Sequence, residues 1–368
     1  MSIVVRVTFR RLKLPLVKPY RLSYRTFHEF EPYVIEIEDS DGRVGYGAAH
    51  ISPGSSSETR EGGLAYLKHR LPRLIGLKTP QAKALMLAQY QESKVATTAV
   101  VTALEVLEAM PVLNRKAPAT LPLLVPVSAL DQAGIETEVE TAIAAGFRTL
   151  KIKVGQNVDT DVTRVGWIQN AVAGRATLRI DANRAYDREA AIAFVRKVDP
   201  DGIVLFEQPC EADQWDDNAA VAVASDIPLM LDEPISTLED IERAAEIPGV
   251  AFCKVKLKRL GSVARLIEGI QHIQAHGMQA VLGDGLGCDL HAWFEACVAA
   301  DHIDNAGEFN GWLKLRDRLF TRPLVFENGS MTVPAGPCPG VDRERLAAAS
   351  TLTITYDKKQ YKGITDVA

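Results

Sequence analysis

The sequence lacks any long apolar run and any cysteine motif. A membrane-spanning helix needs about 18 or more consecutive apolar residues, and no segment of the 368 residues approaches that length. The first residues, Met1–Arg6, begin with a strand-like alternation and contain no signal-peptide core. The five cysteines are scattered and form no Cys-x-x-Cys pair. These absences predict a protein without a membrane partner, with free thiols in a reducing cytoplasm rather than disulfides or zinc ligands.

The sequence also lacks the basic surplus of a nucleic-acid-binding protein. Its 42 lysine and arginine residues are outnumbered by 47 acidic residues, which gives a net charge of −5. Binding to phosphates needs a concentrated basic face, so no nucleic-acid partner is expected. The content of 47% hydrophobic and 24% charged residues is typical of a globular protein. A chain of 368 residues exceeds the size at which one compact core stops growing, so we expect one large domain and a smaller one.

Residues 1–117 are predicted to form an α+β unit, in which strands come first and helices follow. Alternating apolar residues indicate the strands, and apolar residues at intervals of three and four indicate the helices. The polar stretches between them are expected to be loops. The predicted elements are the strands Val4–Leu14 and Pro32–Glu38, the loops Lys18–Phe30 and His50–Ser57, and a helical stretch from Gly63 to Pro111.

After Pro118 the pattern changes to an alternation of strands and helices. Eight predicted strands with helices between them indicate a closed barrel rather than an open sheet. The predicted fold class is therefore α/β: a modified TIM barrel, (β/α)7β, over residues 118–323, with the α+β domain before it. The turn-rich tail, residues 324–368, is expected to run back and pack on that first domain. The predicted strands are Leu123–Ala129, Thr149–Val154, Thr177–Asp181, Gly202–Glu207, Pro228–Asp232, Phe252–Lys256, Gln279–Gly283 and Asp304–Glu308.

Three acidic residues, Asp181, Glu207 and Asp232, each follow a short apolar run, at intervals of 26 and 25 residues. One strand and one helix with their loops take about that many residues, so a barrel brings the three strand ends to one rim. Carboxylates that meet there repel one another unless a cation lies between them, and Mg²⁺ suits a small set of carboxylates and waters. Three unrelated acids that cap helices are the alternative. That alternative fits less well because the spacing is regular and glutamate is a poor cap.

Lysines occupy alternate positions on the two strands that flank the acidic strands. Lys151 and Lys153 share one face of the second predicted barrel strand, and Lys254, Lys256 and Lys258 share one face around the sixth. A lysine inside a barrel is costly to bury unless acidic partners or a reactive role balance its charge. A lysine that is crowded by other cations acquires a lower pKa and acts as a base. The alternatives are solvated strand-end lysines, and Lys254 or Lys258 in place of Lys256.

This order of motifs resembles the enolase superfamily, and within it the muconate-lactonizing-enzyme subgroup. The shared features are a Lys-x-Lys pair on the second strand, carboxylates at the ends of strands three, four and five, and a lysine on the sixth. Mandelate-racemase-like relatives place a histidine on strand seven, where this sequence reads Gly283-Asp284-Gly285. The resemblance implies an N-terminal capping domain, a (β/α)7β barrel and a C-terminal return. It also suggests a homo-oligomer.

The resemblance assigns roles to individual residues. The implied Mg²⁺ ligands are Asp181, Glu207 and Asp232. Lys153 and Lys256 are the implied acid/base residues on opposite faces of the substrate. Lys151 is expected beside Lys153, where it would lower the pKa of Lys153 and contact the substrate carboxylate.

Three further residues, Asp284, Glu308 and Arg25, are candidates for substrate binding. Asp284 follows strand seven between two glycines that permit close approach of a ligand, and a plain tight loop is the alternative. Glu308 ends the eighth strand and either meets the substrate or forms a structural ion pair. Arg25 and Tyr24 belong to the first predicted loop, which would close over the substrate together with the His50–Ser57 segment.

Together the motifs predict a Mg²⁺-dependent enzyme that removes the α-proton of a small carboxylate substrate. Loss of that proton places negative charge on the carboxylate oxygens, where a divalent cation stabilises it. Lys153 and Lys256 on opposite faces favour racemisation or epimerisation of an amino-acid derivative, or a related cycloisomerisation. The same first step can end in loss of a leaving group, as in a dehydratase or an o-succinylbenzoate-synthase-like lyase. A barrel that only binds a ligand is the third alternative, and the retention of five costly charges in one pocket argues against it.

Overall fold

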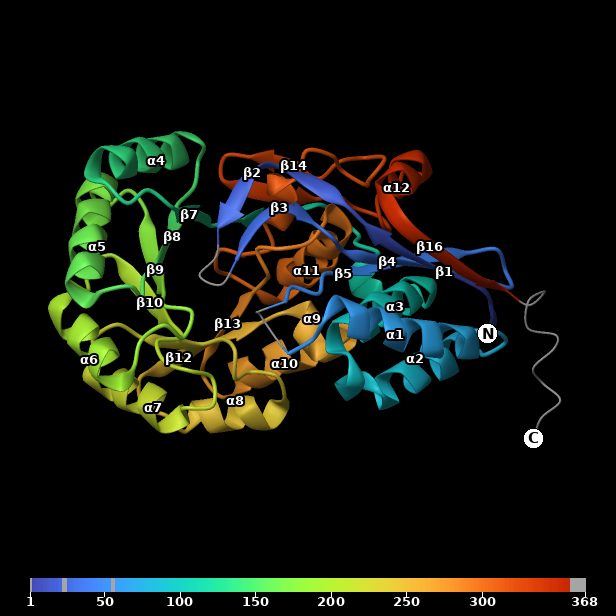
Figure 1. Ribbon diagram of the computed structural model, residues 1–368, viewed down its shortest axis with the longest axis horizontal. Helices are drawn as coiled ribbons and strands as arrows, with labels where there is room; N and C mark the ends of the chain where they lie inside the picture. Colours follow the sequence, from blue (N-terminus) through green and yellow to red (C-terminus); the bar gives the residue numbers. More distant parts are fainter. Residues whose placement is uncertain (1, 22–24, 54–56, 358–368) are drawn as a thin grey trace.

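The computed structural model describes residues 2–21, 25–53 and 57–357 (Figure 1). A curled parallel sheet ringed by helices lies beside an antiparallel sheet that is covered by helices of its own. In the parallel sheet the strands neighbour one another in chain order, as they do in a β/α barrel. These strands are β7 (Val125–Val127), β8 (Thr149–Lys153), β9 (Thr177–Asp181), β10 (Ile203–Glu207), β11 (Leu229–Leu231), β12 (Val250–Val255) and β13 (Gln279–Leu282).

The barrel helices alternate with these strands and lie outside the sheet (Figure 1). Several begin at a polar side chain that accepts a hydrogen bond from a free helix amide, such as Asp131 from Gly134 and Thr237 from Asp240. Within the described residues no helix is both long and apolar enough to cross a membrane. The helices are α4 (Gln132–Ala144), α5 (Val158–Val172), α6 (Arg188–Lys197), α7 (Trp215–Ala224), α8 (Leu238–Ala245), α9 (Leu257–Leu260), α10 (Val263–Ala275) and α11 (Asp289–His302).

The segment Asp304–Glu308 is irregular, so the prediction of a regular eighth strand was wrong. The segment nevertheless joins the two edges of the seven-stranded sheet. The amide of Glu308 donates to the last residue of β13 (2.9 Å), and Gly307 forms an isolated parallel bridge just ahead of β7. A continuous ladder is interrupted because the buried guanidinium of Arg179 binds the carbonyl oxygen of Ala306 (3.0 Å).

The antiparallel sheet has the strand order β16–β1–β4–β5. Its elements are β1 (Val4–Leu12), β4 (Tyr33–Asp39), β5 (Val44–Ala49) and β16 (Ser350–Asp357), with the helices α1 (Arg60–Arg70), α2 (Thr79–Ala88) and α3 (Lys94–Leu107). The two predicted strands of this region are confirmed as β1 and β4. Helix α3 lies directly on β5, where Gly45 and Gly47 leave room for the helix backbone. A Cβ atom at Gly47 would lie 2.1 Å from the carbonyl oxygen of Ala99.

The predicted loop Lys18–Phe30 is largely a hairpin, and that prediction was wrong. Its strands are β2 (Leu14–Arg21) and β3 (Thr26–Phe30), which pair antiparallel. The hairpin is stabilised by burial of apolar side chains such as Leu16 and Phe27. Pro15 and Pro19 are typical of loops in a sequence, but a two-stranded hairpin has edges on which proline is tolerated.

The C-terminal residues return to the N-terminal sheet. Strand β16 pairs with β1 over its length, and Val7 lies opposite Tyr356. Before β16, the strand β15 pairs with β14 on one side and with β6 on the other, in a separate small sheet. The remaining elements are β6 (Ala119–Pro122), β14 (Val325–Glu327), β15 (Ser330–Val333), α12 (Arg343–Ala349) and the 3₁₀ turns η1 (Leu71–Leu74), η2 (Tyr90–Glu92), η3 (Pro111–Leu113) and η4 (Gly311–Lys314). The sheet beside the barrel is therefore built from both ends of the described chain.

Candidate active site

A pocket of about 120 Å³ lies at the carboxyl ends of the barrel strands. Its wall includes the ends of β8, β9 and β10 and the residues that follow β11, β12 and β13. Four residues from the N-terminal part of the chain also line it: Tyr20, Glu58, Lys94 and Val95. Side chains from different strands converge at this end of a β/α barrel, so the pocket is the candidate active site.

The three predicted acids lie side by side in the pocket wall. Asp181 and Glu207 end β9 and β10 and stand opposite each other in the parallel pairing. Asp232 directly follows β11. Each of the three residues is at most 2% exposed, so each is costly to keep charged without a cation nearby.

Lys151 supplies one such cation from the adjacent strand β8. Its Nζ lies 2.9 Å from Asp181 Oδ2, 2.7 Å from Glu207 Oε2 and 2.9 Å from Glu308 Oε1. Burial of the amine opposes its charge, but these three carboxylates raise the pKa of Lys151 well above its usual value. Burial would raise the pKa of Asp181 as well, yet the ammonium groups of Lys151 and Lys153 lower it to about 2. The structure therefore fixes Lys151 in its charged form.

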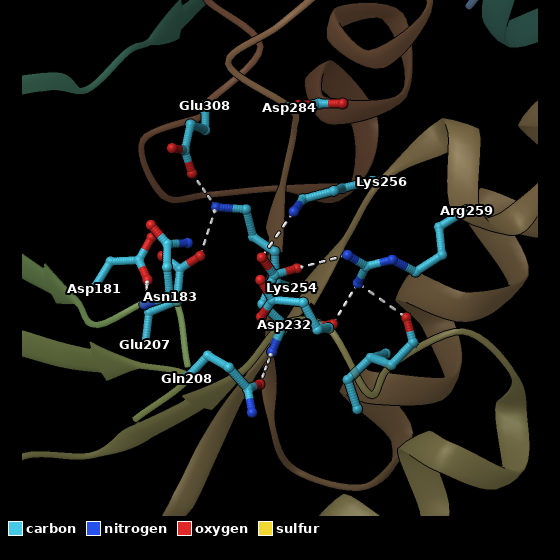
Figure 2. A network of polar contacts seen from close by, with 12 residues as sticks. Asp181, Asn183, Glu207, Gln208, Asp232, Lys254, Lys256, Arg259, Asp284 and Glu308 are labelled. Atoms are coloured by element: carbon cyan, nitrogen blue, oxygen red, sulfur yellow. Dashed lines mark hydrogen bonds and ion pairs between the residues drawn. The ribbon is translucent and has the colours of Figure 1, made fainter. Parts of the chain in front are cut away.

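Lys153 and Lys256 lie on either side of the acids. Lys153 Nζ lies 2.5 Å from Asp181 Oδ2 and donates to Asn183 Oδ1 at 2.6 Å. Lys256 Nζ lies 2.7 Å from Asp232 Oδ2 (Figure 2). Lys153 belongs to β8 and Lys256 directly follows β12, and the strands between these two in the sheet are β9, β10 and β11. The two amines thus flank the set of three carboxylates.

Each of the three lysines around the sixth strand meets a different acid. The pairs are Lys254 with Glu308, Lys256 with Asp232, and Lys258 with Asp284. Figure 2 shows the first two pairs on neighbouring sides of the site. Lys254 also lies 3.6 Å from Glu207 Oε1 and is almost completely buried. Of the three lysines, only Lys256 contacts an acid of the predicted metal-binding set within 3 Å.

Arg259 is a functional candidate that the sequence did not reveal. Its Nη2 lies 2.9 Å from Asp232 Oδ1, and its Nη1 donates to the main-chain oxygens of Asp232 and Ile235 (Figure 2). The amide of Asp232 donates to Gln208 Oε1 at 2.9 Å. Burial of Asp232 would raise its pKa, but Lys256 and Arg259 hold that pKa well below the usual value. Arg259 lies in the short helix α9, whose direction cannot be foreseen from the strand pattern.

The predicted substrate-binding residues are not all in the pocket. Asp284 and Glu308 line it. Burial would raise the pKa of Asp284, but Lys258 and Lys256 lower it to about 2. Arg25 is exposed and stacks over the Phe27 ring at 5.3 Å, and it is absent from the described residues that line the pocket. The other loop candidates, Tyr24 and residues 54–56 of the His50–Ser57 segment, lie outside the described residues.

The backbone is strained immediately after two of the acids. Asn183, Arg184 and Gln208 have positive φ angles of 45°, 68° and 38°, which side-chain-bearing residues rarely adopt. The strained turn lets the Asn183 amide donate to Asp181 Oδ1 at 2.8 Å. Such strain clusters at functional sites, where the surrounding structure must maintain it.

Three carboxylates from adjacent strands are the donor set that a hard divalent cation prefers. In the described part of the chain no group of three or more His, Cys, Asp or Glu side chains is already gathered as a metal site, because basic side chains reach the acids first. Glu207 Oε2 is buried and lies 2.7 Å from Lys151 Nζ. The three buried carboxylates fit Mg²⁺ as ligands, provided that the lysines in contact with them release them.

Comparison with known proteins gives a consistent result. The model of a family described as enolase C-terminal domain-like matches residues 134–345. The L-Ala-D/L-Glu epimerase of Bacillus subtilis is 24% identical over 92% of this chain and 96% of its own length. Muconate cycloisomerase 1 of Acinetobacter baylyi is 26% identical over 90% of this chain and 95% of its own length. The o-succinylbenzoate synthase of Bacillus subtilis is 24% identical over 92% of this chain and 94% of its own length. These relatives are isomerases and a synthase, and all are enzymes.

A solved structure has the same fold over nearly the whole chain. The dipeptide epimerase of Cytophaga hutchinsonii, complexed with Mg and the dipeptide D-Ala-L-Val, superposes with a TM-score of 0.87. It is 22% identical and covers 96% of this chain and 99% of its own. The likeness establishes the fold, including the parallel barrel sheet and the N-terminal antiparallel strands.

Proposed function

This chain belongs to the enolase C-terminal domain-like family, and we propose that it is a Mg²⁺-dependent enzyme that removes the α-proton of a small carboxylate substrate. When the enediolate regains a proton on the opposite face, the net reaction is a racemisation or epimerisation of an amino-acid derivative. When a ring C–O bond β to the carboxylate breaks instead and its electrons leave on the ring oxygen, the net reaction is a related cycloisomerisation. The observation that carries the proposal is the pair of lysines, Lys153 and Lys256, on either side of three buried carboxylates. The epimerase and cycloisomerase relatives support it.

Lys153 and Lys256 are the proposed acid/base residues. Inversion at one carbon needs one group on each face of the substrate, one that removes the proton and one that returns it. The two amines approach the acids from β8 and from the end of β12, with three strands between them. In the reverse direction the two lysines exchange these tasks.

Asp181, Glu207 and Asp232 are the proposed Mg²⁺ ligands. When bound, the ion supplies positive charge that stabilises the dianionic carboxylate formed as the C–H bond breaks. Support comes from the burial of three carboxylates side by side at the ends of adjacent strands and from the Mg-containing complex of the Cytophaga hutchinsonii epimerase. Arg259 and Gln208 would keep Asp232 oriented through the contacts that they make with it.

The remaining candidates would bind and orient the substrate. Lys151 carries a charge that three buried acids maintain, and it is placed to attract the reacting carboxylate. Asp284 and Glu308 line the pocket. They would position Lys258 and Lys254, with which they form ion pairs. Arg25 remains a proposed substrate-binding residue from the sequence alone, because it does not line the pocket in the described part of the chain.

Exchange of the α-proton with solvent tests the proposal directly. The protein is incubated with Mg²⁺ in D₂O with a panel of N-acyl amino acids, proline derivatives and dipeptides, and ¹H NMR and optical rotation are followed. We expect loss of the α-proton signal with deuterium in both enantiomers or epimers. The variants K153A and K256A should each lose at least about 10²-fold in rate, whereas K197A, at an exposed ion pair on α6, should not. Full activity of K153A would overturn the assignment.

A lyase that uses the same first step is the second candidate. The o-succinylbenzoate synthase relative favours it, and the fate of the enediolate depends on what lies β to the carboxylate. The same NMR experiment separates the two reactions. If an alkene signal accumulates together with one equivalent of released leaving group, the reaction is an elimination and not a racemisation.

A further inference from the structure

The buried side chain of Arg164 joins the carboxyl ends of two neighbouring barrel strands. Arg164 lies in α5, the helix that follows β8 outside the barrel sheet (Figure 1), and is 6% exposed. It is not among the described residues that line the pocket. Its guanidinium donates to three main-chain oxygens: Nη1 to Lys153 at 2.8 Å, Nη2 to Val127 at 2.8 Å and Nε to Ala129 at 2.9 Å. Lys153 and Val127 are the last residues of β8 and β7.

The shape of a guanidinium makes this contact a rigid one. The group is planar and holds its five N–H donors in a fixed fork. Because each of its three nitrogens binds a different carbonyl oxygen, the plane fixes the positions of those oxygens relative to one another. An ammonium has all its donors on one nitrogen, so a lysine at this position could not span the three. Arg164 therefore holds the end of β8 against the end of β7 and the residues that follow it.

Asp161, three residues earlier on α5, binds the chain just beyond Lys153. Its carboxylate is 5% exposed. Its Oδ2 accepts hydrogen bonds from the amides of Gly155, Gln156 and Asn157 at 3.0, 3.0 and 3.1 Å. Residues three apart on a helix lie on the same face. One face of α5 therefore holds both the last peptide group of β8 and the turn that follows it.

The fixed strand end matters because Lys153 would lose its acidic partner in the working enzyme. Its Nζ lies 2.5 Å from Asp181 Oδ2 and donates to Asn183 Oδ1 at 2.6 Å. If Asp181 becomes a ligand of Mg²⁺, that ion pair is released. A lysine has a long, flexible side chain, so the direction of its amine then depends mainly on the backbone that carries it. A displacement of about 1 Å at a reacting group can lower a rate ~10²-fold.

The end of the strand that carries Lys256 is held by other elements. Leu257, the next residue, donates its amide to the buried Glu295 of α11 at 3.1 Å. The carbonyl oxygen of Lys256 accepts from the amide of Arg259 at 2.9 Å, at the start of α9. The hydrogen bonds of Arg164 in the described part of the chain all go to the ends of β7 and β8. Loss of Arg164 should therefore disturb one of the two proposed acid/base residues and spare the other.

We propose that Arg164 is a positioning residue for Lys153, which holds the ends of β7 and β8 so that the amine of Lys153 faces one side of the bound substrate. The proposal deepens the proposed function and rests on it. On that side the α C–H bond breaks, its electron pair stays on the substrate as the enediolate, and the proton passes to Lys153 Nζ. Arg164 contacts neither the substrate nor the transferred proton.

Exchange of pure enantiomers tests one side of the substrate at a time. Each enantiomer, or epimer, of a compound that the wild-type protein turns over is incubated in D₂O with Mg²⁺, and the loss of its α-proton signal is followed by ¹H NMR. The enantiomer that Lys153 serves is the one whose exchange K153A abolishes. For that enantiomer R164M should lower kcat about 10- to 100-fold, and for the other enantiomer kcat should stay within about threefold.

Further measurements separate positioning from general stability. KM should change little for either enantiomer, because Lys151, the other lysine of β8, is held by three carboxylates. R164K keeps a cation that can bind one or two of the three oxygens, so it should retain more of the affected exchange than R164M. Arg115 donates to the main-chain oxygen of Cys297 at 3.3 Å and is not among the described residues that line the pocket. R115M should therefore leave the ratio of the two enantiomers unchanged.

The pattern of loss decides the role of Arg164. Equal loss for both enantiomers in R164M, loss for the other enantiomer alone, or no loss would overturn the proposal. Unfolding midpoints verify that each variant is folded. Where R164M is too unstable to assay, R164K takes its place, and its smaller loss should again be confined to the enantiomer that Lys153 serves.

The two proposals can fail separately. If the wild-type protein exchanges the α-proton of no compound tested, or if K153A keeps the exchange of both enantiomers, the proposed function fails. Amide hydrogen exchange followed by mass spectrometry then still decides what Arg164 holds. In R164M the amides of residues 150–157 should exchange about threefold faster or more, and those of residues 252–260 should not change. Equal changes in the two segments, or none, would show that Arg164 does not fix the end of β8.

Discussion

At the scale of single residues, the pocket is organised by ion pairs between different strands. Lys151 on β8 holds Asp181 on β9 and Glu207 on β10. Lys254 on β12 holds Glu308, which follows β13 across the barrel. A buried charge that loses its partner costs about 3–5 kcal/mol. The ion pairs that position the charged side chains of the site therefore also stabilise the packing of neighbouring strands.

Sequence alone identifies some residues of the site and misses others for a physical reason. Asp181, Glu207 and Asp232 could be placed together because each ends a strand, and a parallel barrel brings strand ends to one edge. Arg259 lies one short helical turn beyond such an end, in α9. The direction of a single turn depends on what packs against it, and local sequence does not encode that contact.

At the scale of elements, the close approach of α3 to β5 predicts a strong effect of one methyl group. Gly47 faces the helix backbone, and a Cβ atom there would overlap the carbonyl oxygen of Ala99. G47A should therefore lower the free energy of unfolding by about 3 kcal/mol, measured by urea denaturation. At Gly166 in α5, a Cβ atom would have no neighbouring atom within 4 Å, so G166A should instead raise stability by about 1 kcal/mol. Equal effects of the two changes would contradict this packing.

Two elements show where sequence patterns mislead. The segment Lys18–Phe30 resembles a loop in sequence because it is largely polar, yet apolar side chains of the β2–β3 hairpin are buried against the barrel side of the molecule. The segment Asp304–Glu308 resembles a strand, yet Arg179 takes one of its carbonyl groups. In both cases a contact between distant parts of the chain outweighs the local preference.

At the scale of the whole molecule, both ends of the chain cooperate to cover the barrel. Strand β16 forms one edge of the N-terminal sheet by pairing with β1. The same N-terminal part contributes Tyr20, Glu58 and Lys94 to the pocket wall. The part of the chain that supplies these residues is thus built on a sheet that β16 completes, although no described residue of β16 lines the pocket.

Removal of β16 should therefore impair the pocket, although the residues that line the pocket stay in the chain. A chain that ends at Ala349 would leave the hydrogen-bonding edge of β1 unpaired, and unpaired edges destabilise a sheet and promote aggregation. We expect a lower thermal unfolding midpoint and a reduced rate of α-proton exchange, because α3, which carries Lys94 and packs on the same sheet, would lose part of its support. A chain that ends at Asp357 keeps all of β16 and is the matched control, with both values unchanged. If the shorter chain matched the control in unfolding midpoint and exchange rate, the N-terminal part would be held by the barrel alone and the C-terminal strand would have no role in the site.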